Sequence, residues 1–191
     1  MAVVPRLSVI VPAYNEARTI RELLTRVLAE DLGDLVREVI IVDDGSQDDT
    51  ARRAEVVAAA YPGRTVRVVR LGVNRGKGAA IREGIHQATG DLVIVQDADL
   101  EYDSQDFRAL LAPFADPAVQ VVYGSRTLGL RIFGGRSSSH RYYWGGQLVT
   151  RMANLLFGAR LTDEPTGYKC FRRALLTALP LRADGFDFCP E

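Results

Sequence analysis

Short runs of aliphatic and β-branched residues alternate, along the first two-thirds of the chain, with longer segments in which apolar residues recur every three or four positions. The short runs are typical of buried strands, and the longer segments predict amphipathic helices. The predicted strands span residues 7–11, 39–42, 66–71, 92–95 and 119–123. The predicted helices cover residues 20–28, 48–60, 78–88 and 107–114, and a further apolar stripe covers residues 148–156.

Strands separated by helices imply right-handed crossovers, and therefore a mostly parallel sheet with helices on both faces. This is an α/β, Rossmann-like arrangement. No repeat or low-complexity linker divides it, so we predict a single domain over residues 1–191. Residues 127–140 are rich in Gly, Ser and Arg and predict a loop. Residues 186–191 form neither a terminal helix nor a polar tail, which we interpret as a truncation at the C-terminus.

The composition narrows the class of protein. The chain is 47% hydrophobic, and its 24 Lys and Arg residues balance 24 Asp and Glu residues, so its net charge argues neither for nor against nucleic acid. We predict no nucleic-acid partner. The two cysteines form neither a metal-type spacing nor a disulfide framework, which favours a reducing, cytoplasmic location. We recognise no signal peptide, and the apolar runs are shorter than the ~20 residues of a membrane-spanning helix.

Polar residues follow each predicted strand at its carboxyl end, where open parallel sheets bind ligands. These five polar segments are residues 12–16, 43–46, 74–78, 97–99 and 124–126. Turn chemistry alone could explain one or two of them. Five along one edge, with acidic and basic residues both present, are better explained by a binding site.

Asp97 and Asp99 follow the fourth predicted strand, where extended backbone would place both carboxylates on one side. Two carboxylates held close together repel each other unless a cation lies between them. Their hard oxygen ligands suit Mg²⁺ or Mn²⁺, which could neutralise a departing nucleoside diphosphate. An isolated Asp-x-Asp is usually a solvated turn, but the four neighbouring polar segments favour a metal site.

The segments after the second and third strands supply further candidates for nucleotide binding. Asp43 and Asp44 precede a tight turn, where a carboxylate can accept hydrogen bonds from a base or a ribose hydroxyl. Arg75 and Lys77 lie among glycines ahead of a predicted helix, where charge and main-chain N–H groups can approach a phosphate.

Together these segments resemble the family 2 glycosyltransferases of the GT-A fold, most closely the polyprenyl-phosphate sugar synthases. The matching segments are residues 11–16, 42–46, 74–78, 97–102, 123–126 and 163–172. The resemblance implies an inverting transfer of a hexose from GDP-mannose or UDP-glucose. It also implies roles for several residues: a nucleoside pocket lined by Pro12, Tyr14 and Glu16, a base or ribose contact from Asp44, and metal ligands Asp97, Asp99 and, as a further ligand, Glu101.

The acceptor implied by the resemblance is a lipid phosphate, which is anionic at neutral pH and needs positioning more than a strong base. Arginine suits that task because its guanidinium grips phosphate oxygens in a fork. The arginines considered for the acceptor phosphate are Arg126, Arg136, Arg141 and Arg172. A glycan acceptor would instead need a base, for which Asp163 is the candidate. The Gln-x-x-Arg-Trp signature of processive polysaccharide synthases is absent from the sequence.

Tyr142, Tyr143 and Trp144, together with the apolar stripe of residues 148–156, would suit a membrane interface, although such a stripe more often packs on a sheet. We therefore expect peripheral contact at the cytoplasmic face of a membrane.

Two alternatives from other classes carry less weight. A sugar nucleotidyltransferase would need a glycine-rich basic loop after the first strand, where residues 12–16 have none. A non-catalytic binding module would not need both metal carboxylates.

Overall fold

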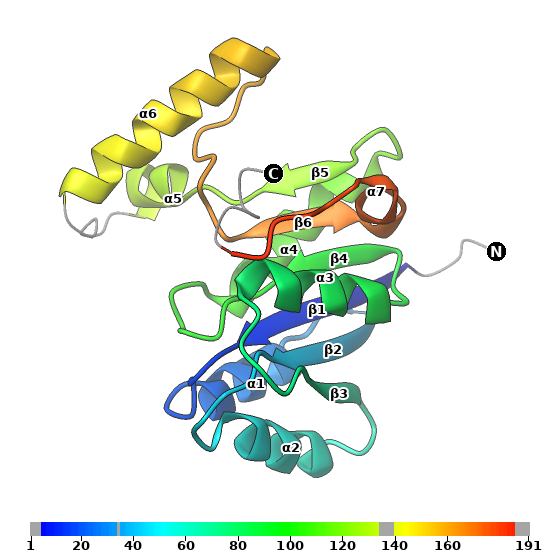
Figure 1. Cartoon of the computed structure of the whole chain (residues 1–191). Coiled ribbons are helices and arrows are strands. Elements are labelled where there is room, and N and C mark those ends of the chain that lie inside the picture. Colours follow the sequence, from blue (N-terminus) through cyan, green and yellow to red (C-terminus); the bar gives the residue numbers. More distant parts are fainter. Residues whose placement is uncertain (1–4, 34, 134–139, 186–191) are drawn as a thin grey trace.

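The computed structural model describes residues 5–33, 35–133 and 140–185, which form one sheet with helices on both of its faces (Figure 1). The sheet has six strands in the order β3-β2-β1-β4-β6-β5. The strands are β1 (Arg6–Ala13), β2 (Val36–Asp43), β3 (Thr65–Arg70), β4 (Leu92–Val95), β5 (Val121–Tyr123) and β6 (Lys169–Arg172). The α-helices are α1 (Ile20–Ala29), α2 (Thr50–Ala60), α3 (Lys77–Gln87), α4 (Phe107–Leu111), α5 (Arg126–Phe133), α6 (His140–Phe157) and α7 (Arg173–Ala178).

Strands β1 to β4 are parallel to one another, which confirms the predicted crossovers. Adjacent residues of a strand point to opposite faces of the sheet, and the central residues of β2 are buried on both faces. Ile41 of β2 faces a core formed with α1, α2 and α4, and its neighbours Ile40 and Val42 face the core beneath α3 and α7. The predicted two-sided α/β fold is therefore confirmed.

Three elements differ from the sequence prediction, and one of them is helix α7, which was not predicted. Strand β6 was not predicted, and it lies antiparallel between β4 and β5. Residues 126–133 form helix α5, although residues 127–140 were predicted to be a loop. The helix forms because Ser125 caps it: its hydroxyl accepts a hydrogen bond from the Leu128 N–H, and its carbonyl accepts one from the Gly129 N–H.

Helix α6 extends away from the sheet (Figure 1). Several large apolar side chains in its second half are exposed: Leu148, Val149, Met152, Leu155, Leu156 and Phe157. The predicted helical stripe is therefore present, but these side chains do not pack on the sheet. Among the described helices, none combines the length and the apolar composition needed to cross a membrane.

Candidate active site

A cavity of about 310 Å³ opens at the carboxyl ends of β1, β2 and β4, beside the first turn of α3. It brings together most residues predicted for donor and metal binding: Pro12, Tyr14, Glu16, Asp44, Lys77, Asp97 and Asp99. Three other predicted residues, Asp43, Arg75 and Glu101, are not part of its lining. The polar segments after β1 to β4 thus meet in one cavity, as their positions in a parallel sheet require, whereas residues 124–126 after β5 are not part of its lining.

The loops after β1 and β2 are tied together by side-chain hydrogen bonds. The Asn15 N–H donates to the Ser46 hydroxyl at 2.9 Å, and the Asn15 side-chain oxygen accepts from the Gln47 N–H at 2.9 Å. Asn15 has a φ of 56°, a left-handed conformation that asparagine tolerates better than most residues. This arrangement leaves the neighbouring Tyr14 at the cavity wall with 42% of its surface exposed.

Asp44 has a role that the sequence did not predict. Its two carboxylate oxygens accept hydrogen bonds from the main-chain N–H groups of Arg75 and Gly76, at 2.7 and 2.8 Å. Asp44 therefore fixes the loop after β3 while it lines the cavity, and the Arg75 side chain is exposed. Asp43 is buried, and among the described residues its Oδ1 atom has no hydrogen-bond partner.

The first turn of α3 is covered by residues 183–185 rather than open to a phosphate. The Ala79 N–H donates to the Asp184 carbonyl, and the Arg82 guanidinium contacts the Ala183 carbonyl and the Asp184 carboxylate. A β-carbon on Gly76 or on Gly78 would collide with these main-chain atoms. The two glycines are therefore explained by close packing of the chain. Only Lys77 carries a positive side chain from this turn into the cavity.

Asp97 and Asp99 both line the cavity, from the loop that follows β4. The Asp97 Oδ1 atom lies 2.6 Å from the Lys77 Nζ atom, and the Asp99 Oδ1 atom accepts a hydrogen bond from the Glu101 N–H at 3.0 Å. Leu100, which lies between Asp99 and Glu101, has a φ of 65°, so the loop turns sharply after the second carboxylate.

The chemistry of these oxygens fits a hard divalent cation such as Mg²⁺ or Mn²⁺. The described residues contain no cluster of three or more His, Cys, Asp or Glu side chains that could hold a metal. Any ion here would therefore rely on Asp97 and Asp99, with its remaining positions filled by diphosphate oxygens and water. The structure does not bring Glu101 to them as a third ligand, because Glu101 is exposed beyond the turn at Leu100.

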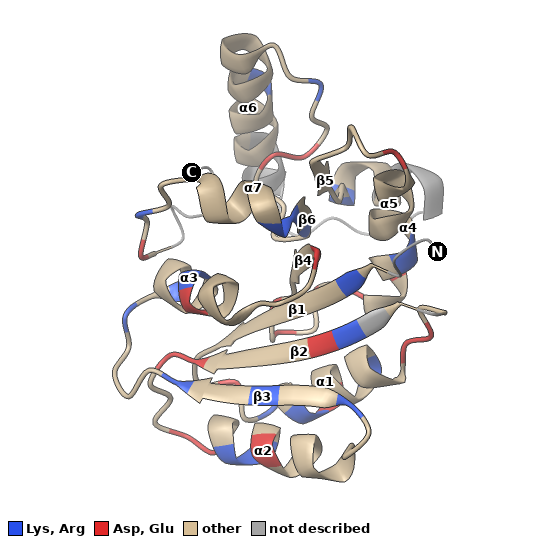
Figure 2. Cartoon of the chain, turned by 90° about the vertical axis from the view of Figure 1, so that its right-hand side faces the viewer, with Lys and Arg blue, Asp and Glu red and all other residues tan. Residues whose placement is uncertain are grey.

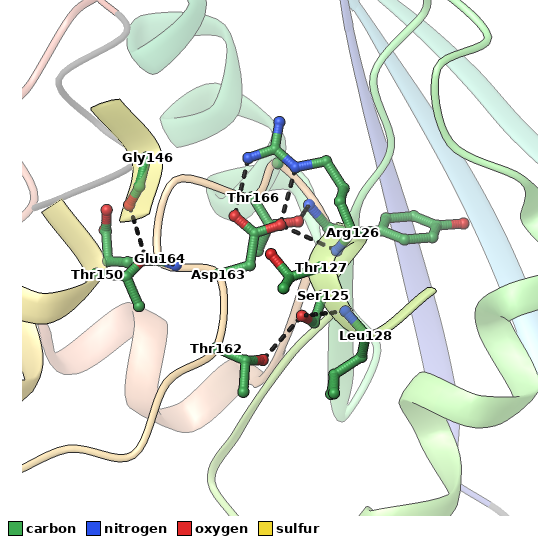
Figure 3. Close-up of polar contacts among 12 residues, drawn as sticks. Ser125, Arg126, Thr127, Leu128, Gly146, Thr150, Thr162, Asp163, Glu164 and Thr166 are labelled. Atoms are coloured by element: carbon green, nitrogen blue, oxygen red, sulfur yellow. Dashed lines mark hydrogen bonds and ion pairs between the residues drawn. The ribbon is translucent and has the colours of Figure 1, made fainter. Parts of the chain in front are cut away.

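Arg126 and Asp163 form a bidentate ion pair on the β5 side of the site (Figure 3). The Asp163 Oδ2 atom accepts hydrogen bonds from the Arg126 N–H and from Nε, and Oδ1 accepts from Nη2, all at 2.9 Å. Asp163 is buried, whereas the Arg126 side chain is about half exposed (49%). These hydrogen bonds raise the pKa of the Arg126 guanidinium, and the nearby charge of Glu101 adds to the effect.

Arg172, another arginine predicted for the acceptor, does not join Arg126. The Arg172 guanidinium donates to the carbonyls of Phe114, Asp116 and Val119. Because β6 runs antiparallel to β4, Arg172 lies opposite Leu92, at the edge of the sheet away from the cavity. Its prediction as an acceptor ligand is therefore wrong. Arg136 and the side chain of Arg141 lie outside the part of the chain that the structure describes.

Sequence reasoning assigned no role to several residues that support the loop after β4. The Tyr102 hydroxyl accepts a hydrogen bond from the Gly167 N–H, and the Tyr168 hydroxyl contacts Gln96 and Asp103. Tyr102 and Gly167 lie within segments already recognised in the sequence, but their pairing depends on the long-range approach of residues 166–168. No local pattern could have revealed it.

Over residues 8–179 the sequence matches the family described as "Glycosyl transferase family 2". The chain belongs to this family. The family 2 resemblance drawn from the motifs is therefore confirmed, and the match gives no support to the nucleotidyltransferase alternative.

Two curated proteins are similar in sequence to this family 2 chain. It is 29% identical over 191 residues to dolichol-phosphate mannosyltransferase of Pyrococcus furiosus, covering 97% of this chain and 51% of that protein. It is 33% identical over 178 residues to undecaprenyl-phosphate 4-deoxy-4-formamido-L-arabinose transferase of Klebsiella pneumoniae, covering 92% of this chain and 51% of that protein. The chain thus spans about half the length of these relatives.

Solved structures agree with the fold. A mannosyltransferase of Pyrobaculum calidifontis in complex with GDP-Man and Mn²⁺ matches with a TM-score of 0.69 and 27% identity, covering 96% of this chain and 49% of that one. Glucosyl-3-phosphoglycerate synthase of Mycobacterium tuberculosis, in complex with Mn²⁺, UDP and phosphoglyceric acid, matches with a TM-score of 0.74 and 25% identity, covering 97% and 61%. The family 2 chain therefore has the predicted GT-A fold.

Proposed function

We propose that this chain is the catalytic domain of an inverting, metal-dependent glycosyltransferase that moves a hexose from GDP-mannose or UDP-glucose to a polyprenyl phosphate. The observation that carries the choice of acceptor is the Arg126–Asp163 ion pair. The donor half rests on the cavity lined by Asp97, Asp99 and Lys77.

In the donor half, Tyr14 and Glu16 would line the nucleoside pocket, and Asp44 would hold the loop that closes its wall. Asp97 and Asp99 would bind Mg²⁺ or Mn²⁺, which supplies positive charge to the leaving nucleoside diphosphate. Relatives support this choice, since solved family neighbours contain Mn²⁺ with GDP-Man or with UDP.

In the acceptor half, Asp163 is poorly placed to act as a base. Its Oδ2 atom already accepts two hydrogen bonds, its Oδ1 atom accepts a third, and only 6% of its side chain is exposed. A hydroxyl acceptor would need that carboxylate as its proton acceptor. A phosphate is already anionic, so it needs only a positioned cation, and Asp163 holds Arg126 ready for that purpose. The pair therefore favours a phosphate acceptor over a glycan.

Helix α6 suits delivery of a lipid to this position. The Glu164 N–H donates to the Thr150 hydroxyl, and Asn154 exchanges two hydrogen bonds with the main chain of Leu161. These contacts tie one side of α6 to the segment that contains Asp163, while its exposed apolar side chains face away. The helix has no acidic residue (Figure 2), which favours contact with an anionic membrane surface. We place this peripheral contact at the cytoplasmic face.

The test is a transfer assay with the full-length protein, a short polyprenyl phosphate, Mn²⁺ or Mg²⁺, and GDP-mannose or UDP-glucose in parallel. We expect a lipid-linked hexose that does not form after addition of a chelator. The matching polyprenyl alcohol serves as a control acceptor and should remain unmodified, because it lacks the anion that Arg126 would bind. Transfer to glycans without transfer to the polyprenyl phosphate would contradict the proposal.

A further inference from the structure

The loop that carries Asp97 and Asp99 needs support from outside its own sequence. Strand β4 ends at Val95, and the next helical turn begins at Ser104, so the intervening residues lack regular secondary structure. Leu100 adopts a φ of 65°, a conformation that is unfavourable for a residue other than glycine and persists only when the surroundings hold it. Residues 166–168 supply contacts on both sides of this turn, at Gln96, Tyr102 and Asp103.

Two tyrosines join this loop to the 166–168 segment. The Tyr102 hydroxyl accepts a hydrogen bond from the Gly167 N–H at 2.8 Å. The Tyr168 hydroxyl lies 3.0 Å from Gln96 Oε1, just before Asp97, and 2.7 Å from the Asp103 carbonyl. The two rings stack with their centroids 4.7 Å apart. The loop is thus held at both ends by one segment.

Gly167 also lies directly against the metal carboxylate. A β-carbon at this position would lie 2.7 Å from Asp97 Oδ2, closer than such atoms can approach, and 3.2 Å from the Tyr102 ring. On the other side, Asp97 Oδ1 lies 2.6 Å from Lys77 Nζ. Asp97 is therefore enclosed between α3 and residue 167, which limits the rotation of its carboxylate. Glycine at 167 provides the space that the carboxylate fills.

We propose that Tyr102 and Gly167 are positioning residues that set the orientation of Asp97 toward a metal-bound nucleoside diphosphate. The inference rests on the proposed function. It adds that residues 163–168, in which Asp163 binds Arg126, also shape the metal site. Partners of metal ligands commonly affect metal affinity by about 10- to 100-fold when they are changed. One short segment thereby aligns the donor metal and the acceptor cation with each other.

The test measures binding of UDP and of GDP by calorimetry, each with and without Mn²⁺, for the wild type and the variants Gly167→Ala and Tyr102→Phe. We expect Gly167→Ala to weaken the Mn²⁺-dependent affinity roughly tenfold or more, and Tyr102→Phe to weaken it by a smaller factor. Affinity without metal should stay within about twofold of the wild type. Tyr102→Phe keeps the stacked ring, so its melting temperature should change little.

Matched controls are available away from the cavity. Gly63→Ala adds a methyl group where no atom lies within 4 Å, and Tyr61→Phe removes a hydroxyl at the end of α2. Both should bind the nucleotides as the wild type does.

The outcomes separate the two proposals. If the wild type binds neither nucleotide with Mn²⁺, the proposed donor site fails, and the inference fails with it. If the wild type binds but Gly167→Ala and Tyr102→Phe match it, only the positioning role is overturned. Equal losses with and without Mn²⁺ would also overturn that role, because they would show a general disturbance of the cavity.

Discussion

The proposed donor and acceptor halves of the site are built in different ways. The donor half consists of the ends of parallel strands, and its loops are fixed by hydrogen bonds such as those that Asp44 accepts from the loop after β3. The acceptor half is assembled from segments after β4 that are joined across the antiparallel strand β6, and its central cation, Arg126, is half exposed. A parallel sheet brings the polar strand ends of the donor half to one edge, where hydrogen bonds between loops fix them, whereas the acceptor half is brought together by long-range pairs such as Arg126–Asp163.

This difference predicts that changes in each half affect different kinetic constants. The largest effect should follow from Asp99→Asn, which removes charge at the metal site but keeps the shape of the side chain. We expect kcat to fall by about 100-fold or more, because stabilisation of the leaving diphosphate is lost. Steady-state kinetics and nucleotide binding in Mn²⁺ check this result. Unchanged nucleotide affinity in Mn²⁺ would mean that Asp99 is not a metal ligand.

The next largest effect is expected for Arg126→Ala in the acceptor half. Loss of a charge-assisted hydrogen bond of about 1.5–3 kcal/mol should raise KM for the polyprenyl phosphate by roughly 10- to 100-fold. KM for the nucleotide-sugar should change little. The variant Arg75→Ala is a suitable control, since the Arg75 side chain is exposed and only its main-chain N–H is used. Equal changes in both KM values for Arg126→Ala would show that the two halves do not act separately.

Substitutions of the exposed apolar residues of α6 should affect only the binding of the protein to membranes and its use of a membrane-bound acceptor. Leu155 and Phe157 are 85% and 82% exposed, so replacing both with glutamate should not disturb the core. We expect binding to vesicles with anionic lipid to weaken about tenfold, since apolar contact is lost and negative charge is added. Transfer to a short, water-soluble acceptor should persist. Co-sedimentation measures the first result, and undiminished vesicle binding would contradict the membrane contact.

A substitution of Glu38, which lies outside both halves, should change stability and leave the kinetic constants as they are. Burial alone would raise the pKa of Glu38, but hydrogen bonds from Ser8 and Thr89 and the charge of Arg67 outweigh it, so the pKa is lowered. Such a carboxylate stabilises the folded state at pH values above its pKa in the unfolded chain, about 4.3. That stability is lost as the pH falls through its pKa in the folded protein.

Glu38→Gln should therefore lower the free energy of unfolding by about 1–3 kcal/mol at pH 7, and by less near pH 4. Urea unfolding at both pH values measures the difference. A loss of the same size at both pH values would show that the charge of Glu38 does not contribute. This result would separate stability from the function of either half.

The same contrast explains what the sequence could predict. Runs such as residues 39–42 are apolar throughout, because both faces of a central parallel strand are buried, so β2 and the donor edge were readily found. Strand β6 was missed because its residues, Lys169 to Arg172, mix charged and apolar side chains and gain a strand conformation only between β4 and β5.

Side-chain roles were harder to predict than positions. Asp44 was correctly placed at the cavity, but its hydrogen bonds to a main chain more than 30 residues away could not be foreseen. Arg172 was assigned to the acceptor from its motif, yet the antiparallel direction of β6 carries it to the opposite edge. Residue type and spacing indicate which groups are available, whereas strand direction decides where they lie.

The packing of residues 183–185 on α3 has a consequence for biosynthesis. Arg82 reaches Ala183 and Asp184 across 101 and 102 positions of sequence, so the first turn of α3, beside the cavity, is covered by residues that the ribosome adds much later. Domains begin to fold from their amino-terminal side during translation, at about 5–20 residues per second. The central strands therefore emerge several seconds before residues 183–185 can pack on α3.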